Sequence, residues 1–377
     1  MTTVLVPRER RPGETRVAAT PETVKRMVKE KLEVVVERGA GAHAHLADDA
    51  YAAAGARLAD EAPWGDADVV LKVAPPLAEE AARVKRGALV IGLLAPHRFP
   101  ELATALNERG ASALALELLP RITRAQGMDA LSSQASIAGY KAVLLAANRL
   151  GRYFPLLMTA AGTIPPARVV IMGAGVAGLQ AVATAKRLGA VVEVSDIRAA
   201  VKEQVESLGG RFIELPASES GEGAGGYARE MSAEFLNRQR EIVARHVAAA
   251  DAVITTALVP GKRAPVLVSR AMVESMHPGT VIVDLAAAEG GNCELSRPDE
   301  EVVHGEVTIL APTNLAAMMA ADASTIYSRN VLALLLHVLR DGQVALDPAD
   351  EIVGAALVTS PPVAPKASAT GSSSPGP

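Results

Sequence analysis

The sequence predicts an α/β protein with two doubly wound parallel sheets, the second domain being inserted in the first. Short apolar runs alternate with helical stretches in two separate series along the 377 residues, the pattern of parallel strands joined by helices. Hydrophobic residues make up 49% of the chain and aromatic residues only 3%, a composition typical of helices packed on such strands. Long helical stretches flank the second series, so we expect the chain to cross between the domains twice.

The first series builds the first domain. Its expected strands are short runs rich in Val, Leu and Ala, at residues 3–6, 33–37, 69–73, 88–94 and 112–116. Helical stretches lie between them at residues 21–29 and 100–107. We expect this domain to comprise residues 1–134 and 318–356.

The second series builds the second domain, residues 135–317. Its expected strands lie at residues 168–172, 191–195, 252–256, 280–285 and 307–310. The flanking helices are expected at 138–149 and 326–339, the latter returning to pack on the first domain. Residues 357–377 are rich in Pro, Ser, Ala and Gly, which predicts a disordered tail.

Charge, cysteine content and hydropathy exclude several classes of protein. The net charge of −4 offers no electrostatic attraction for nucleic acid. Cys293 is the single cysteine, so no disulfide forms within the chain, and no metal-ligand cluster is visible. No signal peptide is visible, and every apolar run is far shorter than the ~20 residues that a membrane span needs. We expect a cytoplasmic protein that does not insert into a membrane itself.

The turn that opens the second series fits a dinucleotide fingerprint. Gly173, Gly175 and Gly178 follow a β-branched strand directly and begin a helix that Gly189 is placed to end. In that motif the glycines allow a tight turn, close approach to a pyrophosphate, and packing of helix on strand. The helix start at Val176 favours negative charge. The alternative is an ordinary strand-to-helix turn.

Asp196 ends the next strand, about twenty residues beyond Gly175, where such folds place a carboxylate on the adenosine ribose. A carboxylate there repels a 2′-phosphate, so NAD(H) is favoured over NADP(H). Arg198 is a complication, because a nearby arginine can accommodate that phosphate.

Several loops are candidates to hold the nicotinamide. Ligands of open α/β sheets bind outside the carboxyl ends of the strands, where the loops at 255–262, 284–292 and 312–314 should lie. Each could equally be a tight turn. The segment 120–134 is more unusual, because two arginines, a carboxylate, amides and hydroxyls crowd a domain boundary. Its alternative is a solvated loop with a helix cap at Ser133 or Ser136.

A glycine-rich segment, residues 218–231, is long for a connection. It is either a mobile lid over the site or a flexible surface loop.

Together these residues resemble a known family. The loop 121–134, the turn 173–178, Asp196-Ile197-Arg198 and the segment 224–231 are similar to the NAD(H)-binding component of proton-translocating nicotinamide nucleotide transhydrogenase. The resemblance runs from about Val4 to Leu339. It implies that hydride passes directly between NAD(H) on this chain and NADP(H) on a partner subunit. Membrane-spanning subunits would couple the exchange to proton movement and hold this chain, as a homodimer, peripherally on the cytoplasmic face of the inner membrane.

The resemblance also implies residue roles. Arg121, Asp129 and Ser132 would hold the nicotinamide, and Gln126 would lie at the junction with the second nucleotide. The remaining implied contacts to NAD(H) are Ile122, Thr123, Arg124, Gly173, Gly175, Val176, Gly178, Asp196, Ile197, Arg198, Gly226, Tyr227, Gln239, Ala257 and Leu258.

The chain departs from the family pattern in two places. Many members carry a Pro and an Arg after the equivalent of Leu315, where this chain has Ala316-Ala317-Met318, so the resemblance assigns that segment no role. Many members also continue into transmembrane helices. We therefore expect a separate soluble subunit.

Two other functions stay open. Alanine dehydrogenase is similar in fold and shares the early pattern around Arg16 and Lys72; Lys72 and His97 would be its substrate lysine and acid–base histidine. We interpret both instead as surface or helix-capping residues, because the context of His97 matches poorly. A nucleotide-sensing protein without chemistry is the third possibility. Hydride exchange between two nicotinamides needs no nucleophile or general base, only aligned rings and exclusion of water.

Overall fold

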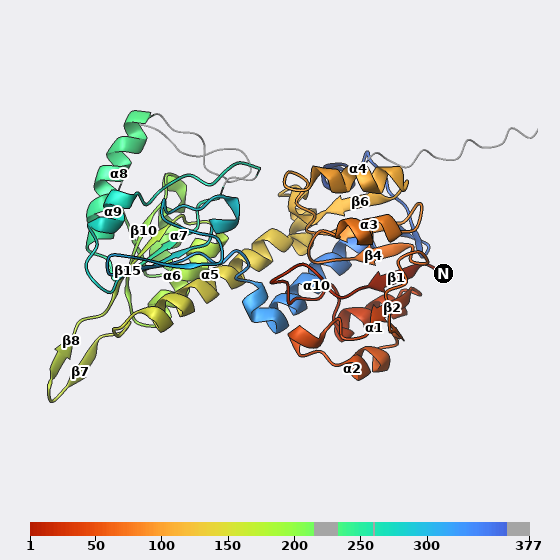
Figure 1. Cartoon of the computed structure of the whole chain (residues 1–377), viewed down its shortest axis with the longest axis horizontal. Coiled ribbons are helices and arrows are strands. Elements are labelled where there is room, and N and C mark those ends of the chain that lie inside the picture. The colour runs from red at the N-terminus through yellow and green to blue at the C-terminus, as the bar shows by residue number, and fades with distance from the viewer. Residues whose placement is uncertain (215–232, 259–260, 360–377) are drawn as a thin grey trace, which may run out of the picture.

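The computed structural model describes residues 1–214, 233–258 and 261–359; of residues 233–237 it describes the backbone alone. Two lobes are joined by two long helices, α5 (Ala130–Arg149) and α10 (Ala320–His337), which run between them (Figure 1). Each lobe holds one sheet with helices on its faces, which confirms the predicted fold class.

The first sheet has six strands in the order β3-β2-β1-β4-β5-β6, and every pair in it is parallel. The strands are β1 (Thr3–Val6), β2 (Glu33–Glu37), β3 (Arg57–Ala59), β4 (Val69–Leu71), β5 (Leu89–Gly92) and β6 (Ser112–Ala115). The helices of this lobe are α1 (Pro21–Lys29), α2 (Asp48–Ala53), α3 (Ala78–Arg83), α4 (Pro100–Glu108) and α11 (Glu351–Ala356). Five of these strands were expected; β3 was missed, because Arg57-Leu58-Ala59 is short and carries no apolar run.

The second sheet has seven strands in the order β11-β10-β9-β12-β13-β15-β14, and only β14 is antiparallel to its neighbour. The strands are β9 (Arg168–Met172), β10 (Val191–Ser195), β11 (Arg211–Phe212), β12 (Ala252–Thr255), β13 (Val281–Asp284), β14 (Glu301–His304) and β15 (Val307–Leu310). Helices α6 (Val176–Arg187), α7 (Lys202–Ser207), α8 (Ala233–Ala248) and α9 (Arg270–Glu274) belong to this lobe. The strand order reverses between β9 and β12, and open α/β sheets bind their ligands at the carboxyl ends of the strands at such a point. We call this place, at the carboxyl ends of β9 and β12, the crevice.

The helix α10 returns to the first lobe, as expected. Tyr327, Val331 and Leu335 on it are fully buried in the apolar core that covers one face of the first sheet. The helix α5 begins eight residues before the predicted start, because Asp129 caps it. We propose domain boundaries at 134/135, within α5, and at 317/318, just before α10.

The described chain stays ordered slightly beyond the predicted start of the tail. Val358 donates its backbone N–H to Ala113, and the buried hydroxyl of Thr359 accepts a hydrogen bond from the Ala113 N–H at 2.9 Å. Residues 357–359 therefore lie against β6 in the first lobe. The rest of the expected tail lies outside the described residues.

A short hairpin, β7 (Leu157–Thr159) and β8 (Gly162–Ile164), projects from the second lobe after α5 (Figure 1). Across the residues with described structure, we find no helix with both the length and the apolarity that a bilayer span requires.

Candidate functional site

The glycine turn lies between β9 and α6, as its motif predicts. A Cβ on Gly178 would lie 1.9 Å from the carbonyl oxygen of Gly173, so only glycine permits this contact of helix and strand. Gly173 adopts φ +105°, a left-handed conformation that suits glycine. A Cβ on Gly175 would meet nothing within 4 Å, so the backbone there faces open space at the start of α6.

This helix start suits a pyrophosphate. The cap position, Gly175, offers no side-chain acceptor, and Val176 is 39% exposed. The first N–H groups of α6 therefore point toward a place that an anion can occupy. Ser195 is the last residue of β10, and its buried Oγ has no hydrogen-bond partner among the described residues. These features fit a dinucleotide.

Asp196 is buried next to the turn, and its carboxylate is already engaged. Its Oδ2 accepts a hydrogen bond from the Ala174 N–H at 2.7 Å and from Arg198 Nη2 at 2.7 Å. Its Oδ1 accepts from the backbone N–H and from Nε of Arg198 at 2.8 and 2.9 Å. Ile197 is half-buried between them. A carboxylate offers about four acceptor positions, so a ribose hydroxyl must share Asp196 with Arg198.

The loop after β12 borders the same crevice. Thr256 Oγ1 donates to the Gly173 carbonyl at 3.1 Å, which ties this loop to the glycine turn. Ala257 follows with both its backbone polar atoms bonded to the Asn292 side chain, at 3.0 and 2.9 Å. Leu258 is 43% exposed beyond it. The backbone N–H and carbonyl of Ala257 are therefore both engaged within the protein.

The segment 121–132 forms a short 3-10 helix, Thr123–Met128, followed by the start of α5. Ala125 and Met128 are buried under it, whereas Arg121, Thr123 and Gln126 are exposed and Ile122 is half-buried. Arg124 lies 3.5 Å from Asp350, between Nη1 and Oδ2.

Asp129 caps α5. It accepts hydrogen bonds from the backbone N–H and hydroxyl of Ser132, at 2.8 and 2.6 Å. The alternative interpretation of this segment placed a helix cap at Ser133 or Ser136, but the cap of α5 is Asp129. Asp129 and Ser132, both implied nicotinamide contacts, hold each other in place.

The segment is held from behind by α10. Asn330 Nδ2 donates to the Gly127 carbonyl at 2.9 Å, and its Oδ1 accepts from the Ser133 hydroxyl at 2.7 Å. No motif in the sequence pointed to Asn330, because it lies about two hundred residues away in the chain and only the fold brings it here.

The helices α5 and α6 touch at one point of closest approach. A Cβ on Gly139 of α5 would lie 2.0 Å from the carbonyl oxygen of Ala177, in the first turn of α6. The two helices therefore meet backbone to backbone, with the 121–132 segment at the start of one and the glycine turn at the start of the other.

Polar contacts also bridge the lobes. Arg16 is buried and pairs with Glu14 at 2.7 Å, while its Nη1 donates to Gln134 Oε1 at 2.8 Å. Asn314 of the second lobe donates to Glu14 Oε2 at 3.1 Å. Burial raises the Glu14 pKa, but the Arg16 hydrogen bonds and charge outweigh it, so that the pKa is lowered overall.

Lys72 is not a surface residue, contrary to the sequence interpretation. It is fully buried after β4, and its Nζ lies 2.9 Å from Glu9 and 3.5 Å from Glu80. Burial raises the pKa of Glu9 although the Lys72 charge opposes it. Only the folded chain reveals these two carboxylates as the partners that make a buried lysine tolerable. His97, by contrast, is 40% exposed and lies 3.8 Å from Glu289 of the other lobe.

Three implied contacts remain. Gln239 is buried on α8. Gly226 and Tyr227, with the expected lid 218–231, lie outside the described residues.

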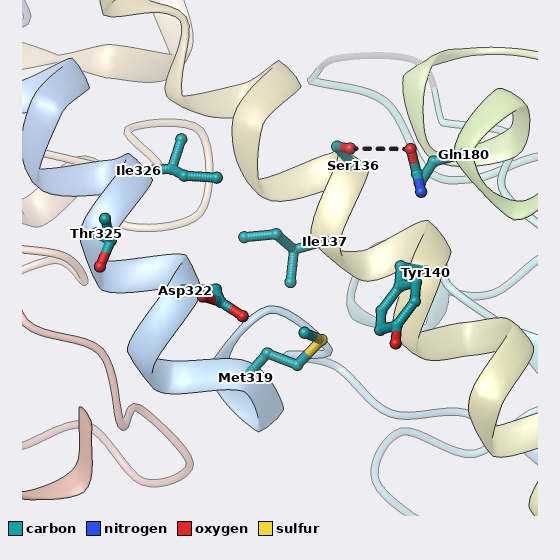
Figure 2. A pocket seen from close by; sticks show the side chains of 8 residues that line it. All are labelled: Ser136, Ile137, Tyr140, Gln180, Met319, Asp322, Thr325 and Ile326. Carbon is teal, nitrogen blue, oxygen red and sulfur yellow. Dashed lines mark hydrogen bonds between the residues drawn. The ribbon is translucent and has the colours of Figure 1, made fainter. Parts of the chain in front are cut away.

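A pocket of about 380 Å³ opens between α5, α6 and α10 (Figure 2). Its lining contains neither the glycine turn nor the 121–132 segment; it consists of Ser136, Ile137, Tyr140, Gln180, Met319, Asp322, Thr325 and Ile326. We therefore place the candidate site at the crevice between β9 and β12, and not in this pocket.

The fold and the crevice define a two-domain dinucleotide-binding protein of the dehydrogenase type. The chain belongs to the alanine dehydrogenase/PNT family: residues 5–138 match the model of its N-terminal domain and residues 142–361 that of its C-terminal domain.

Within the family, the chain is more similar to transhydrogenase subunits than to alanine dehydrogenase, which confirms the resemblance seen in the sequence. It is 50% identical to an NAD(P) transhydrogenase alpha subunit of Rhodospirillum rubrum, over 94% of this chain and 96% of that protein. A crystal structure of transhydrogenase from Sinorhizobium meliloti superposes with a TM-score of 0.86 at 45% identity, covering 95% of this chain and 98% of the other. Alanine dehydrogenase of Bacillus subtilis is more distant, at 33% identity over 77% of this chain and 71% of that enzyme.

Proposed function

We propose that this chain is the NAD(H)-binding subunit of a proton-translocating NAD(P) transhydrogenase. Hydride would pass directly between NAD(H) on this chain and NADP(H) on a partner subunit. One observation carries the proposal: the backbone contact of Gly139 with Ala177 joins the polar 121–132 segment to the helix start that suits a pyrophosphate. The reactive ring and the phosphates would thus be held by a single rigid unit.

Different residues of the crevice would bind the pyrophosphate, the adenosine and the nicotinamide. The glycine turn and the start of α6 would bind the pyrophosphate, with Val176 against it, and Asp196, Ile197 and Arg198 would bind the adenosine. Arg121, Asp129 and Ser132 would orient the nicotinamide, with Ala257 and Leu258 bordering the ring and excluding water. Ile122, Thr123, Arg124 and Gln239 would be further contacts, and Gly226 and Tyr227 would belong to a closing segment.

Bound NAD(H) would supply the carbon that gives or takes the hydride. No protein group needs to exchange a proton in that step. The chain's task is to hold the ring and leave one face open to the second nucleotide, where the exposed Gln126 would stand at the junction.

The partners follow from the same proposal. An NADP(H)-binding subunit would dock on the open side of the crevice, and membrane-spanning subunits would couple the exchange to proton translocation. The chain would act as a homodimer, held peripherally on the cytoplasmic face of the inner membrane by those subunits.

The test mixes the purified chain with a transhydrogenase NADP(H)-binding domain and follows reduction of an NAD analogue by NADPH. We expect exchange only in the mixture. A Gln126→Ala variant should slow it while leaving NADH binding by the chain alone unchanged. Gln343→Ala is the matched control. This exposed glutamine lies on β17 (Gln343–Val344), next to Gly342, whose carbonyl bonds to Thr2 at the amino end of β1, whereas the crevice lies at the carboxyl ends of strands in the second sheet. Alanine-dependent reduction of NAD by the chain alone, with an inactive mixture, would contradict the proposal.

A further inference from the structure

Asn292 is buried next to the loop that follows β12, and both polar atoms of its side chain are hydrogen-bonded to backbone groups. Its Oδ1 accepts from the Ala257 N–H at 3.0 Å, and its Nδ2 donates to the carbonyl oxygens of Ala257 and Pro265, at 2.9 and 2.8 Å. The residue is 0% exposed. One N–H and two carbonyls as partners determine which amide atom is oxygen and which is nitrogen.

The backbone of Asn292 is held just as firmly. Asp284, fully buried at the end of β13, accepts a hydrogen bond from the Asn292 N–H at 2.8 Å. The same carboxylate accepts from Thr255 Oγ1 at 2.9 Å and from Ser296 Oγ at 2.6 Å. Thr255 ends β12 opposite Asp284 in the parallel register. Asp284 thus links the carboxyl ends of β12 and β13 and holds the backbone of Asn292 next to them.

These contacts determine the path of the loop after β12. Thr256 bonds to the glycine turn, and the next residue, Ala257, has both its polar backbone atoms taken by Asn292. Leu258, which follows directly, is 43% exposed. A shift of the Asn292 amide would move Ala257 relative to the glycine turn, and with it the loop that we propose to border the nicotinamide.

We infer that Asn292 is a positioning residue for hydride transfer: it holds the Ala257–Leu258 loop against the nicotinamide half of the bound dinucleotide. The inference rests on the proposed function. It assigns Asn292 no contact with the cofactor, and it predicts that the adenosine and pyrophosphate half of the site is independent of this residue.

The test is Asn292→Asp, which keeps the shape and one acceptor but replaces the donor to two carbonyls by a carboxylate at neutral pH. We expect the affinity for ADP, a probe of the adenosine and pyrophosphate half, to stay within about twofold, whereas that for NADH weakens. At saturating nucleotides, the single-turnover hydride-transfer rate with an NADP(H)-binding domain should fall about tenfold or more, because small misplacements of reacting groups are costly. The rate relative to wild type should rise as the pH falls from about 8 to about 6, because the protonated carboxyl regains a donor and burial raises its pKa.

Thr280→Val is the control. Thr280 is also fully buried, but it bonds to His277 and Ala250 carbonyls at the opposite, amino end of β13. This variant should lower the melting temperature without affecting the rate. If Asn292→Asp behaves like Thr280→Val, Asn292 is merely structural and the inference fails. If wild type binds NADH but exchanges no hydride, the transhydrogenase proposal fails, while the comparison of ADP with NADH still decides whether Asn292 positions the nicotinamide half. If the wild-type chain does not bind NADH, both the proposed function and the inference on Asn292 fail.

Discussion

Asp129 and Ser132 form a closed pair at the start of α5: the serine amide reaches Oδ1 at 2.8 Å and its hydroxyl reaches Oδ2 at 2.6 Å. Two residues implied as nicotinamide contacts are therefore also the cap of the helix that joins the lobes. In the proposed function, this carboxylate would serve both the helix and the cofactor, so a variant that removes it is expected to affect stability and binding together.

Comparing Asp129→Ala with Asp129→Asn distinguishes the capping role of this carboxylate from its proposed role in NADH binding. Asp129→Ala removes the cap and should lower the free energy of unfolding by about 1 kcal/mol, and NADH should bind more weakly. Asp129→Asn keeps a good capping residue, so its stability should stay close to wild type. Urea unfolding and NADH fluorescence titration measure the two effects. Equal NADH affinity for all three proteins would show that Asp129 is a helix cap only.

Gly139 should tolerate no side chain. Alanine is favoured over glycine inside a helix by about 1 kcal/mol, but the Cβ would lie 2.0 Å from the Ala177 carbonyl oxygen, so the backbone of one helix has to shift. We expect Gly139→Ala to destabilise the protein by about 2–3 kcal/mol and to weaken NADH binding, since α5 must move away from α6. Gly151→Ala, where a Cβ meets nothing within 4 Å, is the control and should stay within about 0.5 kcal/mol of wild type. A stabilised Gly139→Ala protein would disprove the close contact.

Asp196 should govern the choice of nucleotide. Asp196→Ala removes the charge that opposes a 2′-phosphate and releases Arg198 from its pairing at 2.7 Å, so discrimination against NADPH should weaken about tenfold. Asp196→Asn still accepts the hydrogen bond from the Ala174 N–H and isolates the effect of charge. Titrations with NADH and NADPH give the ratio. An unchanged ratio in both variants would argue against a ribose role for this carboxylate.

Replacing Lys72 alone should destabilise the protein more than replacing Lys72 and Glu9 together. Lys72→Met leaves Glu9 buried without its partner at 2.9 Å and should cost about 3–5 kcal/mol. Adding Glu9→Gln should restore part of that loss, because Glu80, the second carboxylate at Lys72, then keeps only Arg10 Nε, at 3.8 Å, as a charged partner among the described residues. The same proteins test the alternative function, alanine dehydrogenase, since wild type should reduce no NAD with alanine. Activity with alanine that disappears in Lys72→Met would favour that alternative.

Asp350 should produce a loss of stability at acid pH. It caps α11, and the His337 hydrogen bond, followed by the Val353 N–H, lowers its pKa to about 2. Because the folded pKa lies below the ordinary value of about 3.9, its contribution is present above about pH 4 and is lost as the pH falls toward about 2. Asp350→Asn retains a capping residue without the charge, so its unfolding free energy should depend less on pH in this window. Identical pH profiles for the two proteins would contradict this assignment.

Local sequence determined most of the strands and the glycine turn of this protein. Strands such as 168–172 and 191–195 were predicted at their observed bounds, because buried parallel strands are short apolar runs and glycine turns have a fixed spacing. The 121–132 segment stood out for its density of polar residues. The family, too, could be read from these motifs.

Only the tertiary structure decided which distant residues stand behind the site. Asn330 under Gly127, Asn292 beside Ala257 and Glu9 on Lys72 are each joined across many residues by the packing of separate elements. A single asparagine or lysine carries no periodicity and no motif, so nothing in its neighbourhood distinguishes a buried, fully bonded side chain from a solvated one. Burial is a property of the folded chain, and it makes these hydrogen bonds obligatory, because an unpaired polar group inside the protein is costly.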